Sequence, residues 1–205
     1  MSQKPAATVR NFLSVRFDGK GIPYGGNGEV RPDGGANFGF KNLKSDPSLI
    51  SSIPELESDA SLKTLVDAIN RSDTGLFSVG CASGDVQEEQ GYRRTGYIEF
   101  AINSKIVAAD ARSYFPAFFH FERTLFERQF QEPVQLSWEL QPATFIDAGS
   151  HGFTSTIYIN TFYFASPEAA GACWAATLGL LGEFLGSVPP QIGEPIYLPA
   201  RTLAG

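Results

Sequence analysis

The stretch PVQLSWELQP at residues 133–142 predicts a β-strand with two chemically different faces. Apolar and polar side chains alternate along it, namely Val134, Leu136, Trp138 and Leu140 against Gln135, Ser137 and Glu139. Successive side chains of a strand point to opposite faces, so we expect one buried face and one polar face. Strands that pair with it must place apolar side chains on the same buried face and polar side chains on the same polar face. We therefore use this strand as the reference for the other predicted strands.

Further segments carry strand patterns that fit this reference. They are residues 8–17, 36–43, 76–83, 92–103 and 153–165. The side chains expected to point inward are Leu13, Val15, Phe17, Phe77, Val79, Cys81, Ile98, Phe100, Ile102, Ile157 and Ile159. The alternation in the last segment breaks near Thr161, which indicates a β-bulge there.

Helical periodicity recurs in the segments between these strands. A helix that Ser58 or Asp59 can cap carries one apolar stripe, formed by Leu62, Leu65, Val66 and Ile69. A second helix is predicted within 113–130. The third, at 166–186, begins with Ser166 as its cap and Pro167 in its first turn. It is apolar nearly all round, so we expect deep burial.

The order strand, strand, helix occurs in 8–71, 76–130 and 133–186. This order predicts the α+β class, with an antiparallel sheet of about six strands and helices packed on one face. Residues 1–186 are expected to form a single domain that includes a glycine-rich loop at 18–35. Residues 187–205, punctuated by proline, are expected to form an extended C-terminal tail.

Composition and charge exclude several classes of function. The 205 residues carry a net charge of −6, and no cluster of Lys and Arg could neutralise phosphates, so nucleic-acid binding is not expected. No stretch reaches the roughly 20 apolar residues of a membrane span. The start, MSQKPAATVR, lacks the apolar core of a signal peptide. Cys81 and Cys173 are interpreted as buried free thiols, which favours a cytoplasmic location.

His120 and Glu122 stand two residues apart in AFFHFERTLFERQF, residues 117–130. On a helix such residues are separated by about 200° of rotation, so the two side chains diverge. The phenylalanines of this stretch recur at intervals of three and four residues, which favours a helix over a strand. We therefore interpret His120 as a structural residue.

The second histidine, His151, lies close in sequence to an aspartate and a serine, the other two residue types of a hydrolase catalytic triad. Asp147, Ser150 and His151 have the side chains of a catalytic triad, but Ser150 and His151 are adjacent and no G-x-S-x-G elbow surrounds the serine. The glycine-rich loop lacks the order of a phosphate-binding motif. The histidines show no metal-ligand spacing, so we predict no cofactor and no metal. A hydrolase-like or small-ligand site near His151 and the 18–35 loop remains the alternative function.

The polar face of the sheet is the main candidate for binding. Its expected contact residues are Arg16, Tyr97, Glu99, Asn103, Gln135, Glu139, Tyr158 and Asn160. A broad polar surface with tyrosines suits protein recognition better than small-molecule chemistry. We predict a binding protein rather than an enzyme: an inhibitor, immunity protein or accessory subunit that neutralises a basic partner. A homodimer, formed through the small residues Gly171, Ala175, Gly179 and Gly182, is a further alternative.

Overall fold

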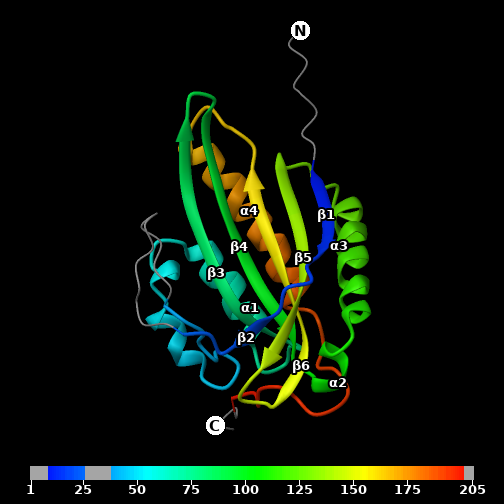
Figure 1. Ribbon diagram of the computed structural model, residues 1–205. Coiled ribbons are helices and arrows are strands. Elements are labelled where there is room, and N and C mark those ends of the chain that lie inside the picture. The colour runs from blue at the N-terminus through cyan, green and yellow to red at the C-terminus, as the bar shows by residue number, and fades with distance from the viewer. Residues whose placement is uncertain (1–8, 26–37, 201–205) are drawn as a thin grey trace.

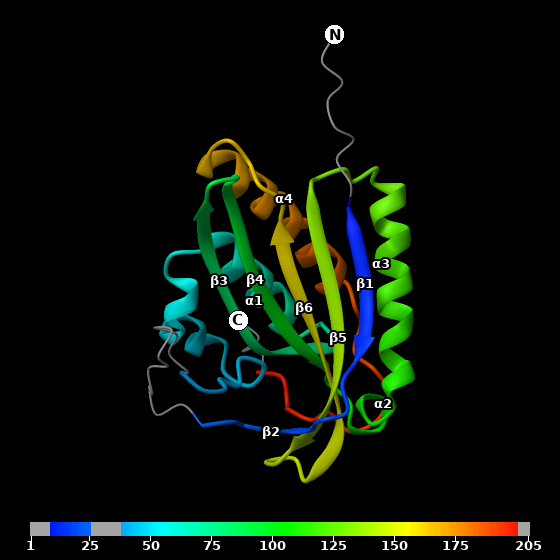
Figure 2. The same ribbon diagram turned by 45° about the horizontal axis from the view of Figure 1, so that its top comes forward.

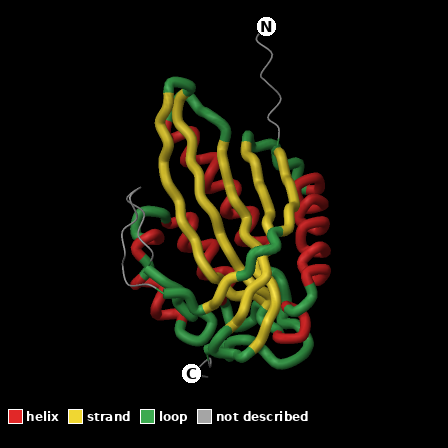
Figure 3. The backbone as a smooth tube through the Cα atoms, viewed as in Figure 1, coloured by secondary structure: helices red, strands yellow, loops and turns green. Residues whose placement is uncertain are grey.

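The computed structural model describes residues 9–25 and 38–200. At its centre lies one six-stranded sheet in the order β1-β5-β6-β4-β3, with the short β2 also paired to β5 (Figures 1 and 3). The strands are β1 (Arg10–Val15), β2 (Lys20–Ile22), β3 (Leu76–Glu88), β4 (Gly91–Ile102), β5 (Val134–Phe145) and β6 (Ser150–Thr161). The α+β class predicted from the sequence is confirmed.

The reference strand lies in β5, and its apolar residues are buried as predicted. Their exposed fractions are between 0% and 2% for Val134, Leu136, Trp138 and Leu140. β5 pairs with β6 in one continuous antiparallel register, from Val134 opposite Thr161 to Phe145 opposite Ser150. The bulge predicted near Thr161 is wrong, because the alternation stops there for a simpler reason: β6 ends at that residue.

A bulge lies instead in β3, where the register with β4 shifts between Ser78 and Gly80. On one side of it Cys81 lies opposite Ile98, and on the other side Phe77 lies opposite Ala101. Residues directly opposite each other share a face, so Cys81 points inward while Phe77 points outward. The inward assignment of Phe77 is wrong because the extra residue of the bulge exchanges the two faces of the strand.

The sheet is not antiparallel throughout, because β1 and β2 both run parallel to β5. Arg10 pairs with Gln135 and Ile22 with Phe145, so this part of the chain follows β5 along its whole length. Residues 38–43 form loop and turn rather than the predicted returning strand, and residues 36 and 37 lie outside the described part. The repeated strand-strand-helix pattern is therefore not confirmed.

The helices are α1 (Ala60–Asn70), α2 (Lys105–Ala108), α3 (Phe115–Glu127) and α4 (Pro167–Leu185), with the 3₁₀ helices η1 (Pro47–Ser52), η2 (Pro54–Leu56) and η3 (Ala111–Tyr114). Two of them, α1 and α4, begin at caps that the sequence predicts. The Asp59 carboxylate accepts a hydrogen bond from the Leu62 amide at 2.9 Å. The Ser166 hydroxyl accepts one from the Ala169 amide at 3.3 Å. Both side chains satisfy amides that have no partner inside the helix.

α1 and α4 lie behind the sheet in Figure 1, whereas α3 lies beside β1 at one edge of the sheet (Figures 1 and 2). All three helices contribute side chains to the hydrophobic core. Part of this core is aromatic: Trp138 meets Phe100, Phe118 and Phe121 with ring centroids 5.7 to 6.2 Å apart. The short helices η1 and η2 lie instead beside α1 at the β3 edge (Figure 1). The prediction that the helices pack on one face of the sheet is therefore not confirmed.

α4 is buried along one side rather than all round. Its inner side includes Cys173, Trp174 and Leu181, whereas Ala175 and Gly179 are exposed. Of the small residues predicted to share one face, Gly182 packs against Leu65 of α1. A side chain added at Gly179 would meet open space. The deep burial expected of this helix is therefore corrected to a half-buried position.

The outer face of the sheet, opposite the helices, is divided into two parts. In the covered part Phe77 packs edge-on against Phe145 and Tyr197, with centroids 5.9 and 5.0 Å apart. Residues 20–24, 38–43 and 196–197 lie over these rings, and Phe40 stacks on Tyr197. The face predicted to be wholly open thus carries a second apolar layer over part of its area.

The tail takes part in this second layer. The Asn103 side chain donates to the Tyr197 carbonyl at 2.8 Å and accepts from the Tyr197 amide at 2.9 Å. Ile196 and Tyr197 are only 7% and 6% exposed. The expectation of an extended surface tail at 187–205 is wrong at these two residues, and residues 201–205 lie outside the described part.

Candidate partner-binding face

The open part of the outer face lies outside the covered part, and Tyr97 stands at the boundary between the two. It consists of Arg10, Phe12, Ser14, Arg16, Thr95, Tyr97, Gln135, Ser137, Glu139, Tyr158 and Asn160. Tyr158 lies between Tyr97 on β4 and Ser137 on β5, and the two tyrosine rings are 6.1 Å apart. Phe12 and Tyr158 are 51% and 37% exposed. Six of the eight predicted contact residues belong to this surface.

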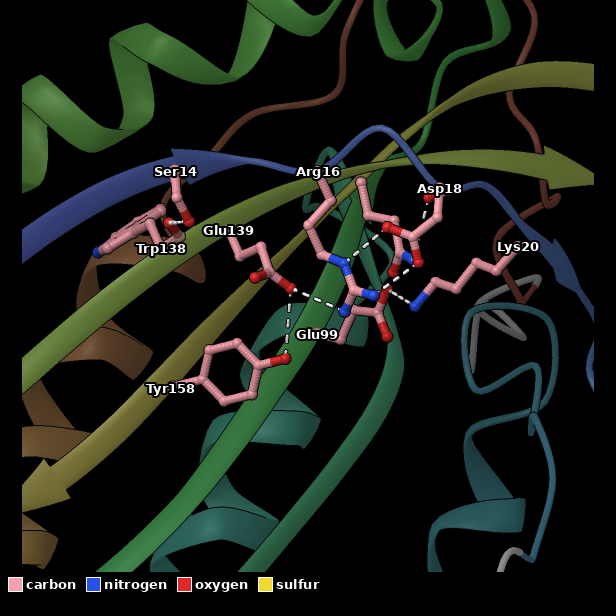
Figure 4. A network of polar contacts seen from close by, with 9 residues as sticks. Ser14, Arg16, Asp18, Lys20, Glu99, Trp138, Glu139 and Tyr158 are labelled. Atoms are coloured by element: carbon pink, nitrogen blue, oxygen red, sulfur yellow. Dashed lines mark hydrogen bonds and ion pairs between the residues drawn. The ribbon is translucent and has the colours of Figure 1, made fainter.

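A network of polar contacts fixes several of these side chains (Figure 4). The Arg16 guanidinium donates to Asp18 from Nε at 2.8 Å, and its Nη1 lies 3.5 Å from Glu139 Oε1. Tyr158 donates its hydroxyl to the same Glu139 oxygen at 3.4 Å. The hydrogen bond from Arg16 lowers the pKa of Asp18, and partial burial next to Glu139 raises the pKa of Tyr158.

The remaining two predicted contact residues are buried. Glu99 is 5% exposed and forms an ion pair with Lys20 of β2, as Figure 4 shows. Asn103 is 7% exposed and holds the backbone of Tyr197. Alternation places both correctly on the outer face, but β2 and the tail cover them. A partner at the open part could not reach either side chain without moving these segments.

A cavity of about 580 Å³ opens at the β3 edge of the sheet, between β3, β4, η2, α1 and the segments that cover the outer face. Its polar lining includes Lys20, Tyr24, Lys41, Glu55 and Tyr97. The Tyr24 hydroxyl donates to the Val79 carbonyl in the bulge at 2.9 Å. A side chain at Gly80 would approach this hydroxyl to 2.8 Å, so glycine at that position leaves room for Tyr24.

The cavity contains no strong nucleophile at neutral pH among its described lining residues. Burial raises the pKa of Cys81 to about 12 and the pKa of Tyr97 to about 12. A thiol acts as a nucleophile in its thiolate form, so Cys81 stays protonated and unreactive near pH 7. These groups suit binding better than covalent catalysis.

Comparison with known protein families, curated proteins and solved structures found no match to this chain. Within residues 9–25 and 38–200, no helix is long and apolar enough to cross a bilayer. The same residues contain no group of three His, Cys, Asp or Glu side chains that could hold a metal ion.

The alternative site near His151 does not assemble as a triad. Ser150 and His151 are neighbours on β6, and neighbouring side chains of a strand point to opposite faces. The His151 Nδ1 atom lies 3.0 Å from the Thr144 hydroxyl across the β5–β6 hairpin. A second cavity, of about 550 Å³, is lined by His151, Thr144 and Lys20. Residues 26–35 of the glycine-rich loop lie outside the described part.

His120 is exposed on α3, and the helix predicted for its segment is confirmed. The features that sequence reasoning missed are β2 and the ion pair between Lys20 and Glu99. β2 has three residues, Lys20, Gly21 and Ile22, inside a glycine-rich stretch, so it offers no alternation to detect. The carboxylate of Glu99 was assigned to the correct face, but its partner could not be identified.

We expect the protein to lose stability steeply above pH 10. Burial raises the pKa of both thiols and of the tyrosines Tyr24, Tyr97, Tyr114 and Tyr197. Unfolded thiols and phenols ionise near pH 8.5 and 10, so the folded state holds more protons in this range and its stability falls as pH rises. Burial lowers the pKa of Lys44 to about 8, which acts in the opposite direction between pH 8 and about 10.4.

Urea unfolding measured at intervals from pH 7 to 11 tests this expectation. Tyr197→Phe is a suitable comparison, because the Tyr197 hydroxyl is buried without a hydrogen-bond partner among the described residues. The variant should match the parent at pH 7 and lose stability less steeply above pH 10. Unchanged stability of the parent up to pH 11 would contradict the expected loss.

Proposed function

We propose that this chain is a protein-binding module whose partner docks on the open part of the outer face. The main support is the division of that face: the chain covers one part with its own apolar residues and leaves the other bare. The bare part presents exposed aromatic side chains, Phe12 and Tyr158, beside hydrogen-bonding groups such as Gln135 and Asn160. Aromatic residues are enriched in the contact regions of protein partners.

The ion pairs of this face prepare it for binding. Arg16 is held between Asp18 and Glu139, so less side-chain freedom remains to be lost when a partner docks. Charges at the site balance, since Arg10, Arg16 and Lys20 stand against Asp18, Glu99 and Glu139. The net charge of −6 therefore lies elsewhere on the molecule. This negative charge would raise the association rate of a basic partner but would not contact the partner in the complex.

Such a partner would be a basic protein that this chain inhibits or accompanies as a subunit. The proposal keeps the class of function predicted from the sequence and narrows the contact surface to the open part. Phe12, which the sequence analysis did not select, joins the contact residues, while Glu99 and Asn103 leave them.

The proposal predicts that substitutions on the open part abolish capture of a specific partner. Tyr158→Ala and Glu139→Lys remove the central ring and reverse the charge at the network, and each should weaken binding at least tenfold, as expected for residues central to an interface. The measurement is a quantitative pull-down from native cell extract, followed by affinity measurement with the purified partner.

Phe126→Ala and Glu122→Lys on α3 are matched controls, because they change an exposed ring and a charge on the helical side of the molecule. Circular dichroism melts confirm that all four variants are folded. If the controls reduce capture as much as Tyr158→Ala does, or if no variant changes it, the open part is not the binding surface.

A further inference from the structure

The cavity beside Tyr97 contains a carboxylate that lacks a partner. Glu55 of η2 lines the cavity, and its Oε2 atom is buried without a hydrogen-bond partner in the described chain. A buried oxygen left without a donor is costly, and in most proteins such an atom is paired with protein, ordered water or a bound group. Glu55 therefore points to a ligand that brings a hydrogen-bond donor, and a positively charged donor fits best.

The same cavity contains an unpaired cation. Lys41 lines it and forms no ion pair with any residue for which coordinates are described. The other charges of the lining are already matched, because Lys20 is bound to Glu99. The cavity thus has one free positive and one free negative side chain, and these two do not pair with each other.

Part of the remaining lining is apolar. Leu43, Ile53, Val66 and Val79 belong to it, together with Tyr97. A volume of about 580 Å³ lies within the range of small-molecule sites. A ligand that fills this space would place an apolar group against the aliphatic side chains while its charged ends meet Glu55 and Lys41.

We propose that this cavity binds a small zwitterion with an apolar side chain, that is, a free α-amino acid or a very short peptide. The ammonium group donates to Glu55, the carboxylate accepts from Lys41, and the apolar side chain packs against Leu43 and Ile53. The proposal does not depend on the partner-binding face, since none of these four residues belongs to the open part.

A matched series of probes separates the three contacts. L-phenylalanine carries all three groups, phenethylamine lacks the carboxylate, 3-phenylpropionate lacks the ammonium, and glycine lacks the apolar side chain. Isothermal titration calorimetry should show that L-phenylalanine binds at least about tenfold more tightly than each of the other three probes. Each of those three lacks one charged or apolar contact that L-phenylalanine makes.

Variants assign each contact to its residue. Glu55→Gln should weaken L-phenylalanine binding and remove its advantage over 3-phenylpropionate, while Lys41→Met should remove its advantage over phenethylamine. Glu57→Gln and Lys63→Met make the same chemical changes at exposed positions outside the cavity and should leave binding unchanged. Thermal melts identify any variant that has lost its fold.

Two results would overturn the proposal. In one, L-phenylalanine and L-leucine both fail to bind at millimolar concentration to the folded parent protein, which would show a cleft filled by solvent only. In the other, binding is equal in the parent, Glu55→Gln and Lys41→Met, which would place the ligand elsewhere. Neither outcome bears on the docking of a protein at the open part, which the pull-down tests by itself.

Discussion

Replacing Asp59 with alanine is expected to lower the free energy of unfolding by about 3–5 kcal/mol, the range seen when one member of a buried charged group is removed. Asp59 is 2% exposed and joins four elements of the fold. Its Oδ1 atom caps α1 through the Leu62 amide. Its Oδ2 atom accepts from the Ser83 hydroxyl and from Trp174 Nε1, both at 2.8 Å.

Arg94 makes the loss larger. Its Nη2 atom lies 3.4 Å from Asp59 Oδ2, and its guanidinium lies over the Trp174 ring. With alanine at position 59, Trp174 Nε1 loses its acceptor, and among the described residues Arg94 keeps only the exposed Asp85 as an ion-pair partner. The cap alone would account for about 1 kcal/mol, so the remainder measures the buried contacts.

Chemical denaturation of three variants tests this account. Asp59→Asn keeps an oxygen that can cap α1 but loses the charge, and should fall between the parent and Asp59→Ala. Asp67→Ala changes an exposed aspartate of the same helix and should cost less than about 0.5 kcal/mol. A loss below about 1 kcal/mol for Asp59→Ala would show that the cap is its only contribution.

Replacing Lys20 with methionine is the second large effect, with an expected loss of about 3 kcal/mol. The substitution leaves Glu99, whose side chain is 7% exposed, without its cation under the covering segments. This expected loss in the free energy of unfolding lies at the low end of the range for breaking a buried ion pair, because the Lys20 side chain is itself 24% exposed. The result would be visible as a lower midpoint in urea.

A double-mutant cycle distinguishes the stranded charge from lost packing. Glu99→Leu added to Lys20→Met removes the carboxylate, and apolar replacement of both partners is often neutral. The double variant should therefore recover most of the stability that the single variant loses. If the losses of Lys20→Met and Glu99→Leu simply add, the two side chains do not stabilise each other.

Much of the fold could be predicted because short sequence patterns identify individual strands and the first turns of helices. The alternation in β5 reports burial directly, and Asp59 and Ser166 identify the first turns of two helices. The direction of β1 could not be predicted in this way, since a strand alternates identically whether it pairs parallel or antiparallel. Phe77 was misplaced for a related reason: one extra residue at Ser78–Gly80 reverses the faces without changing the composition of the strand.

The candidate site was predicted less completely. Alternation tells which face a residue lies on but not what lies above it, so Glu99 and Asn103 were expected on an open surface. Their cover comes from Lys20 and Tyr197, which are far away in the sequence. The cavity was missed because Lys41 and Glu55 lie in segments without regular periodicity.

The bonds between Asn103 and Tyr197 have a consequence for how the protein acquires its structure during synthesis. Tyr197 follows every described strand and helix in chain order, yet its ring is needed to complete the aromatic layer with Phe77 and Phe145. A chain that has formed its sheet before Tyr197 is synthesised still exposes these two phenylalanine rings. Of the packed layers in the described residues, we therefore expect this one to close last in the order of translation.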